Sequence, residues 1–214
     1  MKKVFPSLKE AEKIWSEGIV YRQTNFQGNV QDQYDEKMYI FHTQNVVKIA
    51  SLLASKTVSL NPEKAYILGL LHDYGRRIDE CRINKFHGCD GYEALSELGY
   101  PIVAKICLTH TFPDKNFSMD KYSYPTNWLD WAKRELHKVN YDDYDKLIQL
   151  CDKLVTGYGI VSIEHRVGSV SKRYNLTQEQ HNNHLNEGLE LKSFFDKLCK
   201  NDIYKIIGIK DDEF

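Results

Sequence analysis

Apolar residues recur along most of this chain at every third or fourth position, the spacing of a helix with one buried face. The repeat is clear from 35 to 55 and again after Asn61, which is suited to cap a helix whose first position is Pro62. That helix is expected to end near Gly75, in a left-handed stop. No stretch alternates apolar and polar residues over several positions as a half-buried strand does. The pattern therefore predicts an all-α protein.

Capping and helix-breaking residues predict where the other helices begin and end. The expected order is a first helix opened by Ser7 and Glu10, a polar loop from 23 to 33, helices over 90–98 and 101–111, an irregular stretch from 112 to 125, a helix from Thr126, a helix over 143–156 ended by Gly157, and a long helix opened by Thr177 and Gln180 that runs to about Lys200. We interpret residues 1–214 as a single domain, with a helical core at about 35–160 and a C-terminal helical extension at 161–214.

The charges are balanced, with 29 Lys and Arg residues against 30 Asp and Glu residues and a formal net charge of −1. This balance argues against nucleic acid or an anionic membrane as a partner and favours a small molecule. The five cysteines include no CxxC pair, so neither a disulfide framework nor a thiolate zinc site is expected. The N-terminus turns polar too early for a signal peptide, and no apolar run approaches the ~18 residues of a membrane helix. A cytoplasmic protein is expected, and its oligomeric state stays open.

Polar residues interrupt the apolar faces of four predicted helices. His42, His72 and His110 each share a helical stripe with aliphatic residues, and Asp152 lies between Ile148 and Val155. A single inward histidine is usually a hydrogen-bonded core residue. An inward carboxylate, however, costs several kcal/mol unless it is paired or binds a metal. Because no matching set of inward Arg or Lys residues accompanies them, these side chains together predict a shared divalent cation.

The sequence around these positions resembles the HD-domain superfamily of metal-dependent phosphohydrolases. His42 stands in Phe-His-Thr-Gln-Asn-Val-Val, His72 and Asp73 in Leu-Leu-His-Asp-Tyr-Gly-Arg-Arg, and Asp152 in Leu-Cys-Asp-Lys-Leu-Val. The resemblance covers the chain from about Tyr39 to Thr156. It implies an all-α, single-domain helical bundle with additional C-terminal helices, in which these four residues bind one metal.

Two further histidines extend the resemblance to the binuclear branch of the superfamily. His87 stands in Phe-His-Gly-Cys-Asp-Gly-Tyr, and His110 stands in Cys-Leu-Thr-His-Thr-Phe. The resemblance implies that both bind a second metal, with Asp73 bridging the two. The implied cofactors are two divalent ions, iron or manganese, and zinc, magnesium, nickel or cobalt would also suit these ligands.

The activity that the resemblance implies is hydrolysis of a phosphoester or phosphoanhydride in a nucleotide-like substrate. A metal-bound hydroxide would be the nucleophile, and Asp73 would be the central catalytic residue. A mixed-valent di-iron oxygenase acting on a polyol or a phosphonate is the main alternative, because related proteins use a similar ligand set. A non-catalytic nucleotide-binding module is a third possibility.

Basic residues beside the metal ligands are candidates for binding substrate phosphate. Arg76 and Arg77 follow the His-Asp pair, and Lys153 follows the last aspartate. The planar guanidinium of an arginine can bind phosphate oxygens through two hydrogen bonds. A surface salt bridge from Arg76 to Asp79 or Glu80 is the alternative.

The stretch between His110 and Asp152 is rich in aromatic and basic residues. A substrate lid is one interpretation, and a helix that packs its aromatic face on the core is the one we favour. The residues concerned are Lys121, Trp128, Trp131, Lys133, Arg134 and His137.

Overall fold

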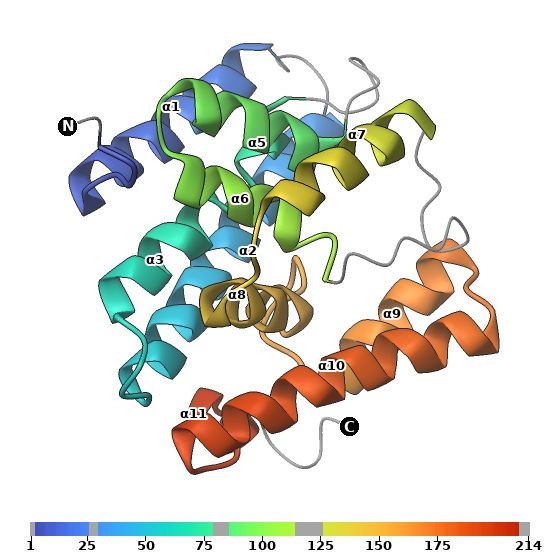
Figure 1. Ribbon diagram of the computed structural model, residues 1–214. Coiled ribbons are helices and arrows are strands. Elements are labelled where there is room, and N and C mark those ends of the chain that lie inside the picture. Colours follow the sequence, from blue (N-terminus) through green and yellow to red (C-terminus); the bar gives the residue numbers. More distant parts are fainter. Residues whose placement is uncertain (1–2, 26–29, 79–85, 114–125, 210–214) are drawn as a thin grey trace.

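A computed structural model gives the fold, and it describes residues 3–25, 30–78, 86–113 and 126–209 (Figure 1). The elements in chain order are α1 (Leu8–Asn25), α2 (Val30–Ser55), α3 (Pro62–Leu71), the 3-10 turn η1 (Tyr74–Arg77), α5 (His87–Glu97), α6 (Pro101–Thr109), α7 (Thr126–Lys138), α8 (Asp143–Lys153), α9 (Ile163–Tyr174), α10 (Gln178–Cys199) and α11 (Ile203–Ile207). Within the described ranges the only β pairing is an isolated bridge between Val155 and Ile160. The prediction of an all-α protein is confirmed.

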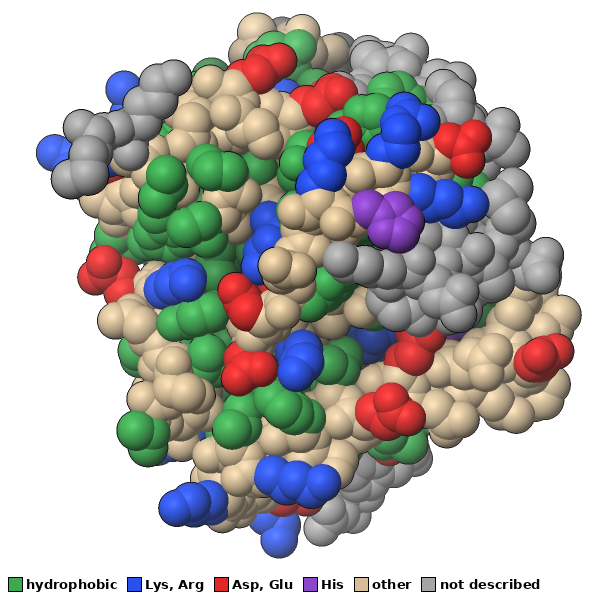
Figure 2. Space-filling model, in the orientation of Figure 1, with side chains coloured by type: hydrophobic (Ala, Val, Ile, Leu, Met, Phe, Trp, Pro, Cys, Tyr) green, Lys and Arg blue, Asp and Glu red, His purple; other side chains and the backbone are tan. Residues whose placement is uncertain are grey.

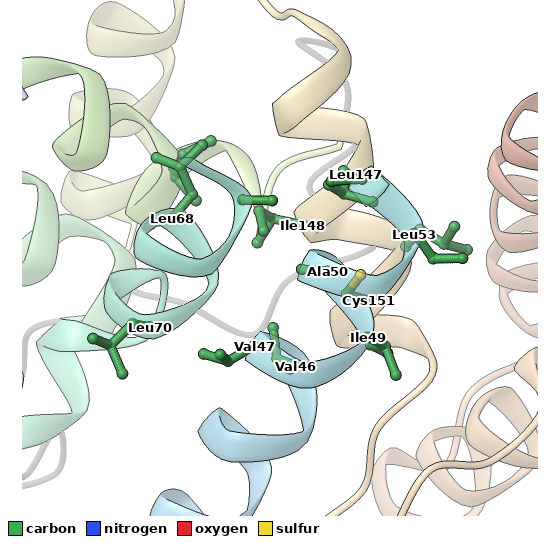
Figure 3. Close-up of a cluster of buried hydrophobic side chains, with 14 of the residues drawn as sticks. Val46, Val47, Ile49, Ala50, Leu53, Leu68, Leu70, Leu147, Ile148 and Cys151 are labelled. Atoms are coloured by element: carbon green, nitrogen blue, oxygen red, sulfur yellow. The ribbon is translucent and has the colours of Figure 1, made fainter. Parts of the chain in front are cut away.

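Helix α2 lies at the centre of the main hydrophobic core. Its residues Val46, Ile49 and Leu53 are at most 1% exposed and form the stripe predicted from the sequence. Figure 3 shows these three side chains in one hydrophobic cluster with Leu68 and Leu70 of α3 and with Leu147 and Ile148 of α8. Burying each large aliphatic side chain contributes roughly 1.5–3 kcal/mol, so this three-helix contact is a major source of stability.

The C-terminal helices pack onto this core. Phe195 of α10 and Ile203 at the start of α11 are fully buried and belong to the same cluster as Leu53 of α2. In Figure 1, α9 and α10 run side by side, next to α8. Residues from both sides of position 160 therefore contribute to one hydrophobic core. The division into a helical core at about 35–160 and an extension at 161–214 stays a prediction.

Helix α7 covers a second hydrophobic cluster at the other end of the molecule. Its residues Leu129, Ala132 and Leu136 are at most 2% exposed and lie in one cluster with Phe86 and Phe112. The two tryptophans of α7 are half-buried against the same cluster. The aromatic face of this helix therefore packs on the core, as the favoured interpretation predicted. Lys121 lies outside the described residues.

The polar loop predicted from 23 to 33 is wrong where the structure describes it. Helix α1 continues to Asn25, and α2 already begins at Val30. Thr24 and Asn25 donate side-chain hydrogen bonds to backbone carbonyls four residues earlier, at 2.6 and 2.8 Å. Polar side chains here form hydrogen bonds with backbone carbonyls in the last turn of a helix. A hydrophobicity pattern cannot distinguish such a polar helix end from a loop.

The predicted helix end at Gly75 is also wrong. Helix α3 ends at Leu71, and Gly75 lies inside η1 without a positive φ angle. Helix α8 likewise ends at Lys153, before Gly157, and the bridge at Val155 follows. Helix α5 begins at His87, three residues before the predicted start at 90, whereas Asn61 accepts a capping hydrogen bond and a capping box opens α10, as predicted. Most of the irregular stretch predicted from 112 to 125 lies outside the described residues.

None of the helices in the described ranges combines the length and the apolar character needed to cross a membrane. On the face drawn in Figure 2, positive and negative side chains both occur across the surface. This distribution agrees with the balanced composition of the chain.

Candidate metal centre

Three helices end at the same place, and each end contributes a predicted ligand. His72 is the C-cap of α3, His110 is the C-cap of α6, and Asp152 lies in the last turn of α8. The C-terminus of a helix carries roughly half a negative charge, so three such ends favour a cation between them. His42 of α2 and His87, the first residue of α5, complete the cluster.

The imidazole rings of His72 and His110 are held in one orientation by their own helices. Nδ1 of His72 lies 2.7 Å from the Gly69 carbonyl oxygen, and Nδ1 of His110 lies 3.0 Å from that of Ile106. A proton on each Nδ1 leaves each Nε2 with a lone pair that faces the cluster. Burial of the imidazole lowers the pKa of His72 to about 4, so this ring is neutral at pH 7.

The carboxylate of Asp73 lies between two pairs of histidines. Its Oδ2 is 3.9 Å from Nε2 of His42 and 3.7 Å from that of His72. Its Oδ1 is 3.2 Å from Nε2 of His87 and 3.4 Å from that of His110. The candidate ligand atoms therefore fall into two groups, each within 4.8 Å, and the two groups share Asp73.

Asp152 lies beside the first of these groups. Its Oδ1 lies 3.0 Å from Nε2 of His42 and 4.0 Å from Nε2 of His72. Burial opposes ionisation of Asp152, but its contact with His42 and the charge of Arg166 hold its pKa below the usual value. The side chain of Asp152 is 28% exposed and that of His42 is 13% exposed, whereas that of Asp73 is 5% exposed. The cluster is therefore most accessible from the side of α2 and α8.

The arrangement fits divalent cations because several nitrogen and oxygen lone pairs face one another with too few N–H or O–H groups to form hydrogen bonds between them. Considering the described residues only, neither Nε2 of His72 nor Oδ1 of Asp73 has a well-aligned hydrogen bond, although both atoms are fully buried. Burial alone would raise the pKa of Asp73, but Arg76 and the histidines hold it well below the usual value, so the carboxylate is ionised. Buried acceptors that face one another are costly, and a bound cation removes that cost. Imidazole and carboxylate are the ligands that iron, manganese and zinc accept.

Glycine residues allow α5 to lie close enough for His87 to reach Asp73. A Cβ atom added at Gly75 would lie 1.8 Å from the His87 carbonyl oxygen. One added at Gly91 would lie 2.9 Å from Cys107 Sγ, and one at Gly88 would lie 2.8 Å from the Cys107 carbonyl oxygen. Gly75 is therefore required by a close approach between η1 and α5, which explains its place better than the predicted helix stop.

The three basic candidates have different surroundings. Arg76 donates from Nε to Asp73 Oδ2 at 2.8 Å, and its Nη2 lies 3.4 Å from Nε2 of His87. The predicted alternative partners of Arg76, at positions 79 and 80, lie outside the described residues. Arg76 is thus at the edge of the cluster, with its side chain 45% exposed.

Arg77 and Lys153 point to other partners. Arg77 pairs with Asp90 of α5 and donates to the Tyr74 carbonyl oxygen at 3.2 Å. Lys153 Nζ lies 4.0 Å from Glu187 Oε2 of α10. The contacts of Arg77 favour a structural role that joins η1 to α5. Substrate binding by either residue stays a prediction.

Sequence reasoning did not single out two residues near the cluster. Arg166 of α9 is close enough to lower the pKa of Asp152, but nothing in its sequence neighbourhood marks it. Gln149 is 3% exposed and lies three residues before Asp152. A signal for Gln149 was present, because Asp145, Gln149 and Asp152 share one face of α8 at spacings of four and three.

Replacing His87 or His110 by alanine is expected to lower the metal content from about two ions per chain to about one, because only the second group of ligands is damaged. Elemental analysis of desalted protein after reconstitution with Mn²⁺ would measure this. His137→Ala is the matched control, since His137 of α7 is exposed and away from the cluster. If both variants keep two ions per chain, the division of the ligands into two groups is wrong.

Comparison with protein families adds an independent observation. The family model of the HD domain matches residues 39–157, over half of the 214 residues. These bounds agree within one residue with the extent expected from the motifs. The comparisons with curated proteins and with solved structures found no match. The matched segment runs from within α2 to just beyond α8 and contains all six clustered residues. The chain therefore belongs to the HD domain family.

Proposed function

We propose that this protein is a metal-dependent phosphohydrolase that cleaves a phosphoester or phosphoanhydride bond of a nucleotide-like substrate. The observation that supports this most strongly is the position of Asp73, with one carboxylate oxygen towards His42 and His72 and the other towards His87 and His110. A carboxylate between two sets of imidazoles suits two cations a few ångströms apart.

When bound, two such cations would lower the pKa of a water molecule towards neutrality and offset the charge that develops on a phosphoryl group. The protein's own part is to hold the ligands in place. His72 and His110 are fixed by their Nδ1 contacts, and Asp73 is kept ionised by its neighbours. No side-chain nucleophile is required by this chemistry.

The substrate would approach from the side of the cluster where Asp152 and His42 are partly exposed. Arg76 is the basic residue whose contacts with the proposed ligands are shortest, and its exposed guanidinium could turn from Asp73 to a phosphoryl oxygen. A charge-assisted hydrogen bond of this kind contributes about 1.5–3 kcal/mol. Arg76 would then bind the substrate and would not be needed to bind metal.

Replacing Arg76 by alanine is expected to raise KM by roughly 10- to 100-fold, the equivalent of one charge-assisted hydrogen bond, while the metal content stays unchanged. Steady-state kinetics together with elemental analysis would measure both quantities. Arg134→Ala, at an exposed position of α7, is the control and should leave KM unchanged. An unchanged KM in Arg76→Ala would remove the proposed role of Arg76.

The proposed function can be tested with anaerobically purified protein reconstituted with Fe²⁺ or Mn²⁺. A set of nucleoside mono-, di- and triphosphates and dinucleoside polyphosphates would be screened for phosphate or nucleotide release without oxygen. Metal-dependent release under these conditions is the expected result. Oxygen consumption with a polyol or a phosphonate, and no anaerobic hydrolysis, would overturn the proposal in favour of oxygenation. Tight nucleotide binding without turnover in fully metallated protein would overturn it in favour of a binding module.

A further inference from the structure

Helix α6 ends with a carbonyl group that its own helix cannot satisfy. Thr109 is the last residue of α6, so its carbonyl is one of the terminal groups without a partner in the helix, and Pro113, four residues later, has no N–H to supply one. Gln149 of α8 supplies the missing donor, since its Nε2 lies 2.9 Å from the Thr109 carbonyl oxygen. Gln149 is 3% exposed, so this bond is made in the interior.

A second contact between the same two helices involves a buried charge. The carboxylate of Asp145 is fully buried and accepts from Thr109 Oγ1 at 2.6 Å and from Lys105 Nζ at 2.6 Å. It also accepts from the backbone nitrogen of Asp142 at 2.6 Å, which closes the capping box at the start of α8. Asp145 therefore fixes α8 against α6, and Gln149 makes a further bond one turn closer to the cluster.

These bonds join the ends of α6 and α8, and each of these ends positions a candidate ligand from a different one of the two ligand groups. Thr109 directly precedes His110, which faces Asp73 Oδ1, and Gln149 lies three residues before Asp152, which faces His42 and His72. The bond from Gln149 to Thr109 thus joins the turn beside one proposed cation to the turn beside the other. The distance between those turns depends on the length of the Gln149 side chain.

We infer that Gln149 is a positioning residue that sets the separation of the two ligand groups, and so would place the cations they hold, by keeping the His110 turn against the Asp152 turn. This inference rests on the proposed binuclear centre. Asp73 touches both groups, so it tolerates only a narrow range of separations. A misplaced His110 turn should weaken the second cation most, because the ligands of the first group lie on α2, on α8 and directly after α3.

The test is Gln149→Met, which keeps the length and the burial of the side chain but removes the amide donor. Mn²⁺ binding would be measured by isothermal titration, together with the electron paramagnetic resonance spectrum of the Mn²⁺-loaded protein. The second Mn²⁺ is expected to bind roughly 10- to 100-fold more weakly, as is typical when a residue that orients a ligand is lost, and the first should be unchanged. The exchange coupling between the two ions should change as well. Gln44→Met, at an exposed position of α2, is the matched control.

A purely structural role would lower thermal stability without changing the ratio of the two affinities, so equal weakening of both ions would overturn the inference. An unchanged second affinity would overturn it too. Gln149→Asn provides a second variant if the methionine variant does not fold: it keeps the amide on a shorter stem and should alter the exchange coupling. If wild-type protein binds fewer than two Mn²⁺ ions, the proposed binuclear centre itself fails, which distinguishes the two failures.

Discussion

Replacing Asp73 by alanine is expected to abolish binding of both cations and to lower hydrolysis by at least about 10³-fold, because metal ions supply several kcal/mol of transition-state stabilisation. Asp73 is the one residue shared by the two candidate ligand groups, with one oxygen facing each. In the described part of the cluster, Asp152 would then be the one carboxylate left among four imidazoles. Elemental analysis and turnover of the same preparation would measure the effect.

Asp130→Ala is the matched control for this variant, since it removes an exposed carboxylate of α7. It should keep wild-type metal content and turnover. Wild-type metal content and turnover in Asp73→Ala would show that the cluster is not the catalytic centre. Loss of turnover with both ions retained would instead separate the chemistry of Asp73 from metal binding.

Replacing Gly75 by alanine is expected to lower the free energy of unfolding by about 3 kcal/mol or more, at the upper end of the cost of overpacking. The added Cβ would lie 1.8 Å from the carbonyl oxygen of His87 and 2.9 Å from the backbone nitrogen of Gly91. Both neighbours are backbone atoms, so no side-chain rotation can relieve the overlap, and η1 would have to move away from α5. Urea unfolding followed by circular dichroism would measure the loss.

Gly168→Ala is the control for Gly75→Ala. Gly168 lies inside α9, and an added Cβ there meets no atom within 4 Å. Because alanine favours a helix over glycine by about 1 kcal/mol, this variant should be neutral or more stable. A similar effect of the two substitutions would contradict the close approach between η1 and α5.

The helices and four of the six clustered residues, His42, His72, His110 and Asp152, could be anticipated because both depend on local periodicity. The stripe of Val46, Ile49 and Leu53 and the cap at Asn61 follow directly from residue spacing. The histidines and aspartates that interrupt such stripes then point inward, and a common cation is the simplest way to satisfy them. The prediction that His87 lies near Asp73, however, required the family resemblance, because no periodic pattern relates the start of one helix to the end of another.

What the sequence did not reveal depends on contacts between distant segments. Gly75 has the spacing of a helix stop, and only the position of the His87 carbonyl shows that it permits a close approach. The spacing of Gln149 places it on the inner face of α8, but only its contact with the Thr109 carbonyl oxygen shows which group it binds. The end of α1 shifted for a local reason: Thr24 donates a side-chain hydrogen bond to a backbone carbonyl four residues earlier, which average propensities do not include.

The meeting of three helix C-termini at one point has a consequence for the lifetime of the folded chain. Without cations, the ends of α3, α6 and α8 direct partial negative charge towards Asp73 and Asp152, so local opening should begin there. Cations that bind the assembled site more tightly than the unfolded chain would shift this equilibrium by mass action. The supply of metal in the cell would then control how often these turns open to proteases, and so how much of the protein persists.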